Sequence, residues 1–396
     1  MTNDFARRAV IGLIGFLTLV DLFAAQAILP TLAETYGVAP SVMGVAVNAS
    51  TIGMAAAGLA VALLSHRLPR RGGIWVSLAL LAIPTTLLAH APDLATFTAL
   101  RIVQGVFMSA AFTLTMAYLS EEGGGSGAAG ALAAYITGNV ASNLVGRLVA
   151  SLLASAAGVA INFYAFAVLN LAGAALVWFT LTSAPPMAAA GEPRIPIIAR
   201  LRAHFTNRCL VACFGIGFCV LFAFLGVFTY VNFVLAAPPL ALPAMALGLV
   251  YLVFLPSIGT TPLAGAAAAR FGPRPTFFAA LGLAVAGLPL LLSPSIVPVI
   301  AGLALVGVGT FFAQAVATGF VGRAARTDRA AASGIYLASY YLGGLAGAWA
   351  VGQVYDRAGW PSGVLLVGIS LTAAAALARM LRPATAGDRA PAAATA

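Results

Sequence analysis

The sequence predicts an all-α membrane protein in which twelve transmembrane helices form two six-helix bundles, with both termini in the cytoplasm. Two observations carry this prediction: 62% of the 396 residues are hydrophobic while only 8% are charged, and the apolar residues lie in long blocks. A water-soluble domain needs roughly a quarter charged residues to cover its surface. An apolar block of about 20 residues spans the hydrocarbon core of a bilayer as one helix.

Twelve apolar blocks are separated by short turns that contain polar residues, glycine or proline. The first block follows Arg7 and Arg8 and is a full-length span without a small-residue cleavage site, so a signal peptide is not expected. The predicted spans cover residues 8–30, 42–64, 74–91, 95–119, 128–151, 159–182, 208–235, 243–268, 276–292, 296–321, 332–355 and 361–381.

The chain divides between the sixth and seventh spans. The stretch "SAPPMAAAGEPRIPIIARLRAHF" is rich in proline and ends in a short basic amphipathic piece, which predicts a linker followed by a helix on the membrane surface. We expect an N-terminal bundle over 1–183, a cytoplasmic linker over 184–206, a C-terminal bundle over 207–382 and a disordered tail over 383–396.

Arginine carries all of the basic charge, since the chain has no lysine, and its distribution indicates the topology. The net charge is +10. With the N-terminus inside, only Arg357 falls on the outer side, while Arg101 and Arg147 fall within spans. The others lie in cytoplasmic segments, as the positive-inside rule requires: Arg7, Arg8, Arg67, Arg70, Arg71, Arg194, Arg200, Arg202, Arg208, Arg270, Arg274, Arg323, Arg326, Arg329, Arg379, Arg382 and Arg389. This pattern indicates contact with anionic lipid headgroups and argues against nucleic acid as a partner.

The two halves repeat one basic turn. "LLSHRLPRR" after the second span and "AAARFGPRP" after the eighth match at the same offset, which pairs Arg67 with Arg270 and Arg71 with Arg274. A six-plus-six repeat of this kind is typical of secondary transporters.

Four motifs resemble the major facilitator superfamily. "ARFGPRP" (269–275), preceded by Gly265, resembles the loop G-x-x-x-D-R-x-G-R-[RK] of that family, and "RIVQG" (101–105) resembles its R-x-x-Q-G signature. Asp21 followed by "QAILP" resembles the first-span pattern of drug-efflux branches. Residues 334–360 resemble the eleventh span of the arabinose-efflux-like sugar or drug branch. The resemblance covers the whole chain and implies the major facilitator fold and alternating access.

The same resemblance implies that the basic turns gate the cytoplasmic side, through Arg67, Arg71, Arg270, Gly272 and Arg274. The chain departs from the family pattern where the loop aspartate is expected, since His66 and Ala269 stand there. "GNVASNLVGR" likewise replaces the G-x-x-x-G-P-x-x-G-G pattern of antiporters in the fifth span.

Asp21 and Arg101 are the candidates for proton coupling. A carboxylate near mid-membrane costs at least about 2.5–3.5 kcal/mol on insertion scales unless it is paired or protonated. Arg101 lies at a similar depth in the fourth span, so the two side chains are expected to meet, with Arg101 tuning Asp21. A fixed structural ion pair, and an arginine that reaches the outer interface, are the alternatives.

A polar stripe in the fifth span, "YITGNVASNLVGR", is the first candidate for substrate contact. Tyr135, Asn139, Asn143 and Arg147 recur every four residues, so they follow one slowly turning line along a helix. Asn139 and Asn143 are the stronger candidates, because Arg147 is near the predicted outer end and is equally consistent with an outer gate or an interface anchor.

Other polar and tyrosine side chains within the spans extend the candidate substrate site. Interhelical hydrogen bonding explains Asn48 equally well, and bundle packing explains the tyrosine pair equally well. The remaining candidates are Gln26, Asn48, Gln104, Asn232, Tyr251, Gln314, Tyr336 and Tyr340.

These features predict a bacterial inner-membrane transporter, most simply a proton-coupled efflux antiporter of a small organic solute. Transport of an organic anion, bound by the two intramembrane arginines, is the first alternative, and a non-transporting sensor or channel is the second. We expect no enzymatic activity, no cofactor beyond the proton gradient and a monomer in the lipid bilayer. Cys209, Cys213 and Cys219 share one span without histidine or carboxylate, so no metal site is expected.

Overall fold

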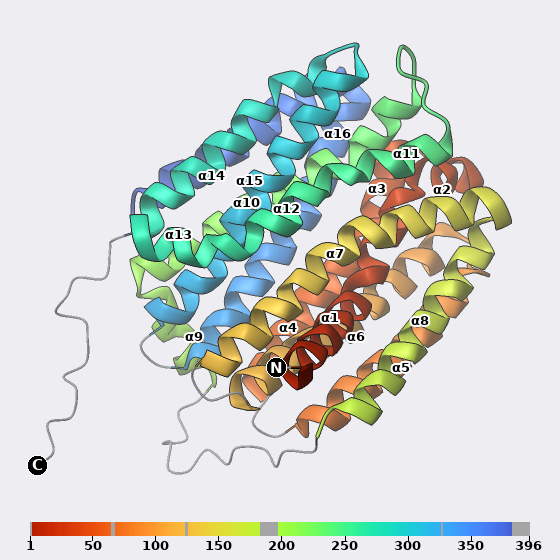
Figure 1. The fold of residues 1–396 in the computed structure, drawn as a ribbon. Helices are drawn as coiled ribbons and strands as arrows, with labels where there is room; N and C mark the ends of the chain where they lie inside the picture. The colour runs from red at the N-terminus through yellow and green to blue at the C-terminus, as the bar shows by residue number, and fades with distance from the viewer. Residues whose placement is uncertain (1, 65–67, 123–125, 183–196, 326–327, 382–396) are drawn as a thin grey trace, which may run out of the picture.

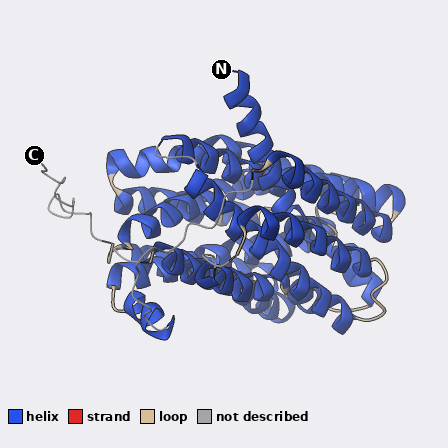
Figure 2. Ribbon diagram, turned by 90° about the horizontal axis from the view of Figure 1, so that it is seen from below, coloured by secondary structure: helices blue, strands red, loops and turns tan. Residues whose placement is uncertain are grey.

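The computed structural model describes residues 2–64, 68–122, 126–182, 197–325 and 328–381. All regular secondary structure in these residues is helical (Figure 2). The helices are long and run side by side (Figure 1), which confirms the predicted all-α class. Arg67, one of the predicted gating residues, lies outside the described residues, as do residues 184–196 of the linker predicted over 184–206 and the tail over 383–396.

The first half of the chain contains eight helices. Six predicted spans account for seven of them, because the second span is divided in two, and the short helix α2 was not predicted. They are α1 (Thr2–Ala27), α2 (Leu29–Tyr36), α3 (Pro40–Asn48), α4 (Ser50–Leu64), α5 (Arg70–Leu88), α6 (Leu94–Glu122), α7 (Ser126–Ala157) and α8 (Val159–Thr180).

The second half begins with the short helix α9 where the basic amphipathic piece was predicted. Its elements are α9 (Ile197–Phe205), α10 (Arg208–Ala236), α11 (Ala244–Val250), η2 (Tyr251–Phe254), α12 (Leu255–Thr260), η3 (Thr261–Leu263), α13 (Ala264–Phe271), α14 (Pro273–Gly287), η4 (Pro289–Leu292), α15 (Ile296–Ala324) and α16 (Arg329–Ala378).

The last helix, α16, holds two predicted spans. Its 50 residues are interrupted at Gly359, where φ is 76° and the backbone is not helical. Counting α16 once, eleven helical runs among the described residues are long and apolar enough to cross a membrane. The break at Gly359 separates the predicted spans 332–355 and 361–381, in agreement with a twelve-helix architecture.

The eighth span departs from the prediction of one continuous helix. It is divided into α11, η2, α12, η3 and α13; η2 ends two residues before Pro256, and η3 contains Pro262. Proline lacks the N–H that an α-helix needs at an interior position, so each proline tightens the preceding turn. This irregular stretch faces α7 and brings Tyr251 and Phe254 toward it.

Close helix crossings hold the first half together. α1 crosses α7, α4 crosses α6, and α5 lies against both α6 and α8. A methyl group added at Gly105 would lie 1.8 Å from the carbonyl oxygen of Ser50, and one added at Gly138 would lie 1.8 Å from that of Gly12. Only glycine permits these backbone approaches.

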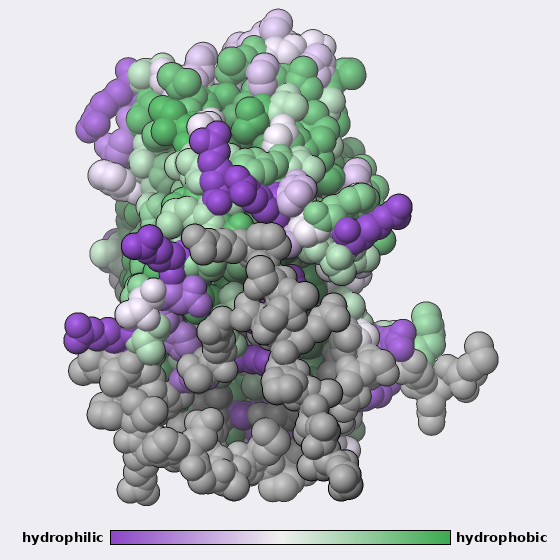
Figure 3. Space-filling view, turned by 90° about the vertical axis from the view of Figure 1, so that its left-hand side faces the viewer, coloured by the Kyte–Doolittle hydropathy of each residue, from purple (hydrophilic) through white to green (hydrophobic). Residues whose placement is uncertain are grey.

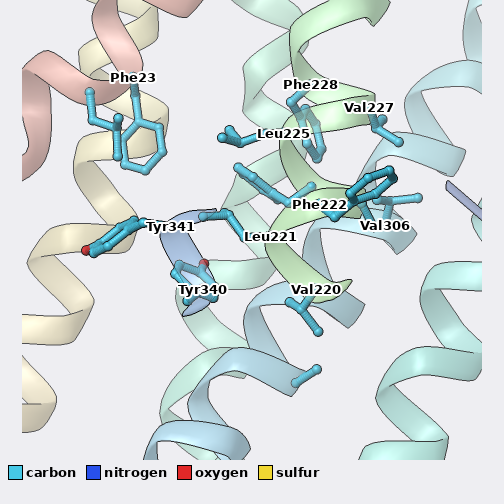
Figure 4. Close-up of a cluster of buried hydrophobic side chains, with 14 of the residues drawn as sticks. Phe23, Val220, Leu221, Phe222, Leu225, Val227, Phe228, Val306, Tyr340 and Tyr341 are labelled. Atoms are coloured by element: carbon cyan, nitrogen blue, oxygen red, sulfur yellow. The ribbon is translucent and has the colours of Figure 1, made fainter. Parts of the chain in front are cut away.

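The two halves meet along a seam formed by three groups of helices. α16 lies against α3 and α4, α7 lies against α11, η2 and α12, and α10 contacts α1, α2 and α3. The apolar core continues across the boundary, since Phe23 of α1 lies in one cluster with Leu225 and Phe228 of α10 and with Tyr340 of α16 (Figure 4).

The outer surface of the bundle suits lipid. Val168, Phe179, Val297 and Leu365 leave 64–82% of their surface exposed. Figure 3 shows one face of the molecule, where hydrophobic side chains predominate and hydrophilic side chains lie in separate groups among them. Apolar contact with acyl chains explains the predominance of hydrophobic side chains.

Candidate functional site

Arg101 is the centre of a buried polar network in the first half. Its side chain is fully buried, and each guanidinium nitrogen has a partner. Nε donates to the carbonyl oxygen of Val47 at 2.8 Å, and Nη2 donates to Ser50 Oγ at 3.2 Å. Nη1 donates to Gln104 Oε1 at 2.6 Å and to the main-chain oxygen of Asp21 at 3.3 Å. The carbonyl of Val47 lies where α3 ends and α4 begins, so Arg101 satisfies an acceptor beside this helix break.

The Asp21 carboxylate bonds to Thr85 and makes no direct ion pair with Arg101. Thr85 Oγ1 donates to Asp21 Oδ1 at 3.4 Å, and Oδ2 is buried without a hydrogen-bond partner. Arg101 and Asp21 do meet, but through the main-chain oxygen of Asp21 and without an ion pair between carboxylate and guanidinium. No ion pair forms because the guanidinium of Arg101 already donates to the main-chain oxygens of Val47 and Asp21 and to the side chains of Gln104 and Ser50.

Thr85 connects the two candidate coupling residues. Its hydroxyl accepts from Gln104 Nε2 at 2.7 Å and from Asn170 Nδ2 at 3.2 Å. The one hydrogen of this hydroxyl is shared between two acceptors, the carbonyl oxygen of Leu81 at 2.8 Å and Asp21 Oδ1 at 3.4 Å. A continuous path of hydrogen bonds thus runs from Asp21 through Thr85 and Gln104 to Arg101. Thr85 and Asn170 were not predicted as site residues, although both are polar residues within predicted spans.

Gln26 joins the first half to the second. Its Nε2 donates to Asn48 Oδ1 at 2.7 Å, and Asn48 Nδ2 donates to Thr229 Oγ1 of α10 at 3.1 Å. The Asn232 amide of α10 donates to the main-chain oxygen of Gln26 at 3.1 Å and accepts from the Tyr251 hydroxyl at 2.5 Å. Four of the predicted substrate residues therefore form one interhelical network across the seam.

Arg147 lies in an aromatic cage built from both halves. The guanidinium carbon is 4.4 Å from the ring centre of Tyr251 and 5.5–5.7 Å from those of Phe23, Phe228 and Phe254. Nη2 donates to Gln26 Oε1. Such geometry favours cation–π attraction.

Arg147 is not an interface anchor, because its side chain is fully buried. α7 continues to Ala157, six residues beyond the predicted end of that span. Arg147 therefore lies about 15 Å from the end of the helix at 1.5 Å per residue.

The buried stripe on α7 retains polar atoms without partners. Both side-chain polar atoms of Asn143, Oδ1 of Asn139, and Nε and Nη1 of Arg147 are buried and make no hydrogen bond. Ser151, one turn beyond Arg147, extends the stripe, and its hydroxyl is also unpartnered. Native interiors satisfy most buried polar groups, so this concentration on one helix face needs an explanation.

Three predicted tyrosines lie in packed positions. Tyr135 is fully buried against Phe112, at 5.6 Å between ring centres, and its hydroxyl is unpartnered. Tyr336 and Tyr340 stack on each other at 6.0 Å with 27° between planes. Gln314, on α15, is partly exposed. These residues do not join the hydrogen-bond networks of Arg101 and Gln26.

Two of the described gating residues, Arg71 and Arg270, contact aromatic residues of their own halves. Arg71 donates to the carbonyl oxygen of Trp178 at 2.5 Å and lies 4.9 Å from the centre of its ring. Arg270 lies 5.2 Å from the ring centre of Phe271, and Arg274 is exposed at the start of α14. Gly272 has φ of 88° and separates α13 from α14, a backbone conformation that favours glycine. In the described part of the chain no group of three or more His, Cys, Asp or Glu is placed to hold a metal.

Comparison with known proteins agrees with this architecture. The family profile described as the Major Facilitator Superfamily matches residues 11–260 and 242–395. The inner membrane transport protein YnfM of Escherichia coli (strain K12) is 28% identical over 346 residues, which cover 87% of this chain and 83% of YnfM. The uncharacterized MFS-type transporter YybF of Bacillus subtilis (strain 168) is 25% identical over 333 residues, covering 83% and 81% of the two chains.

A solved structure shares the fold at low sequence identity. The crystal structure of a mutant of the nucleoside transporter NupG superposes with a TM-score of 0.73 at 13% identity, covering 95% of this chain and 99% of that one. The helical bundle, the membrane-spanning composition and the profile match lead to one conclusion: the chain is a multi-pass membrane protein and a secondary transporter that belongs to the major facilitator superfamily.

Proposed function

We propose that this transporter is a proton-coupled antiporter that exports a small organic solute by alternating access, with Asp21 as the protonation site. One observation carries the proposal. Asp21 is the only acidic side chain that is buried among those the structure describes, and one of its oxygens has no hydrogen-bond partner. An intramembrane carboxylate is costly to retain and is the kind of group that proton-driven transporters use.

The hydrogen-bond path from Asp21 supports a coupling role. The carboxylate shares Thr85 with Gln104, and Gln104 accepts from Arg101. Protonation of Asp21 removes a negative charge beside this path, and the orientation of the Thr85 hydroxyl and the Gln104 amide then changes to suit a neutral acid. Arg101 stays charged throughout and acts as a positioning residue.

The hydrogen-bond network of Gln26, which joins the two halves, is the part of the structure that protonation of Asp21 would affect. Gln26 follows Asp21 in the last turns of α1 and bonds to helices of both halves. The direction of transport rests on the resemblance of the first and eleventh spans to those of efflux branches. In this mechanism the halves rock about the buried network, and solute and proton cross in opposite directions.

Proton flux in proteoliposomes tests the proposal. Liposomes with the pH dye pyranine inside would receive an inward-directed gradient of ethidium, arabinose or benzenesulfonate, three probes of different charge. Antiport predicts that at least one probe makes the lumen more alkaline as it enters. We expect Asp21→Asn to abolish this signal while leaving the protein monodisperse, and Asp356→Asn, at an exposed carboxylate, to preserve it. Solute-driven alkalinisation that persists in Asp21→Asn contradicts the proposal.

A further inference from the structure

The two buried arginines of the first half differ in how their charge is satisfied. Every guanidinium nitrogen of Arg101 donates to an oxygen, and Asp21 supplies a negative charge to the same cluster. Arg147 is equally buried, but only its Nη2 has a hydrogen-bond partner, the neutral Gln26. Nε and Nη1 of Arg147 carry three N–H donors without an acceptor.

No acidic side chain of the described residues compensates the charge of Arg147. Asp21 is the only buried acid among them, and its carboxylate bonds to Thr85 in the Arg101 network. The groups around the Arg147 guanidinium are four aromatic rings, the hydroxyl of Tyr251 and one amide, and all of them are neutral. Ring faces attract a cation, but they cannot accept the three remaining hydrogen bonds as an anion would. A buried, unpaired charge is strongly destabilising, so its retention indicates a ligand.

The unpartnered groups lie in one line. Asn143, Arg147 and Ser151 are separated by four residues each on α7, all three are buried, and each has polar atoms without partners. They lie on the helix that forms the seam with α11, η2 and α12, and Ser151 Oγ would lie 3.1 Å from a methyl group added at Gly248 of α11. Arg147 and Ser151 thus face the boundary between the halves, and Asn143 lies one turn from Arg147 on the same line.

We propose that this line is the binding site for the anionic group of the transported solute, a small organic monoanion with a flat apolar body. Arg147 neutralises its charge, the Asn143 amide and the Ser151 hydroxyl donate hydrogen bonds, and the rings of Tyr251 and Phe254 cover its apolar part. A single arginine without a second cation beside it matches a single negative charge. This inference rests on the proposed function, since it names the class of solute that the transporter carries. It also assigns to Arg101 a structural role, distinct from solute binding.

The location explains how the solute reaches a buried site. Arg147 belongs to α7, whereas Tyr251 and Phe254 belong to η2 in the other half. Separation of the halves along this seam uncovers the guanidinium, and approach of the halves closes the rings over the solute. An anion at Arg147 also competes with Gln26 Oε1 for Nη2, which weakens this one hydrogen bond between α7 and α1.

Equilibrium binding to the purified full chain in nanodiscs tests the site without any gradient. The probes are benzenesulfonate, its neutral near-isostere benzenesulfonamide, and the cation benzylammonium. We expect benzenesulfonate alone to bind saturably and to raise the melting temperature with concentration, because a ligand that binds only the folded state stabilises it. Stabilisation of equal size by benzenesulfonamide overturns the anion assignment, and so does the absence of benzenesulfonate binding.

Variants locate the binding group. Arg147→Gln should weaken benzenesulfonate binding by at least about tenfold, the loss expected for one charge-assisted contact. Arg357→Gln, at an exposed arginine on the outer side, should leave it unchanged. Because Arg147→Gln removes a buried contact and the variant risks misfolding, Asn143→Ala provides an independent measurement and should weaken binding several-fold. Unchanged affinity in a folded Arg147→Gln or in Asn143→Ala overturns the proposal.

A further variant tests the ring of Tyr251. Tyr251→Leu removes the ring that lies 4.4 Å from the guanidinium carbon of Arg147 and should reduce benzenesulfonate affinity. Asp21→Asn should still bind benzenesulfonate. Asp21-dependent proton flux without benzenesulfonate binding would refute only this inference. Benzenesulfonate binding without Asp21-dependent proton flux would refute only the proposed function.

Discussion

Arg101 donates to the main-chain oxygen of Asp21 at 3.3 Å, and the carboxylate of Asp21 bonds instead to Thr85. The arginine thus holds the backbone of α1 at this point while the acid can gain or lose a proton without breaking an ion pair. A direct salt bridge would oppose protonation, because neutralising one partner leaves the other charge buried and unpaired. This separation of roles suits a carboxylate that must change its protonation state in each cycle.

Thr85→Val should damage the coupling path. Valine has nearly the shape of threonine but cannot donate to Asp21 or accept from Gln104 and Asn170. Leaving those buried groups without partners costs about 1–3 kcal/mol. We expect a lower melting temperature in nanodiscs and a reduced solute-driven proton flux.

The matched control for this prediction is the neighbouring residue. Thr86 is half-buried, and its hydroxyl bonds only to the carbonyl oxygen of Ala82 in its own helix. Thr86→Val should change neither the melting temperature nor the solute-driven proton flux measurably. Equal effects of the two substitutions would show that the position of Thr85 in the network has no special importance.

Gly105→Val should prevent the close approach of α6 to α4. Even the first carbon of the new side chain would lie 1.8 Å from the carbonyl oxygen of Ser50 and 3.0 Å from the backbone nitrogen of Met54, so the helices must separate. Because Arg101 reaches Val47 and Ser50 across this crossing, its network is lost with it. We expect little monodisperse protein on size-exclusion chromatography.

Gly282 provides the comparison, because a methyl group added there meets no atom within 4 Å. Gly282→Ala should express and elute like the parent protein. Normal yield and stability of Gly105→Val would contradict the described crossing of α4 and α6.

Asn48 and Thr229 should be energetically coupled across the seam. The amide of Asn48 donates to the hydroxyl of Thr229 at 3.1 Å, and the two residues belong to different halves. A double-mutant cycle with Asn48→Ala and Thr229→Ala, followed by denaturation in mixed micelles, should give a coupling energy of about 0.5–1.5 kcal/mol, the usual range for interhelical hydrogen bonds in membranes. Strict additivity of the two substitutions would exclude this contact as a bond that holds the seam.

Local sequence properties determined the architecture of this protein. Span length, the arginine count on each side and the repeated basic turn predicted the helical membrane class, and each depends only on residues near one another in the chain. Asp21, Arg101 and the α7 stripe were visible for the same reason, because any polar side chain is conspicuous within an apolar span. The breaks in the eighth span at Pro256 and Pro262 could also have been predicted from proline chemistry.

Only the tertiary structure decided which of these groups meet. Helical periodicity assigns a residue to a face of its own helix, but the partner of that face depends on crossings between distant segments. The sequence therefore suggested that Arg101 pairs with the Asp21 carboxylate, whereas packing at Gly105 directs it to Val47 and Ser50. The aromatic cage of Arg147 likewise joins α1, α7, α10 and η2, and Phe228 and Phe254 are indistinguishable in sequence from ordinary core residues. The sequence by itself determined which charged residues lie within the membrane, and the fold determined that Arg147 has only neutral groups around it.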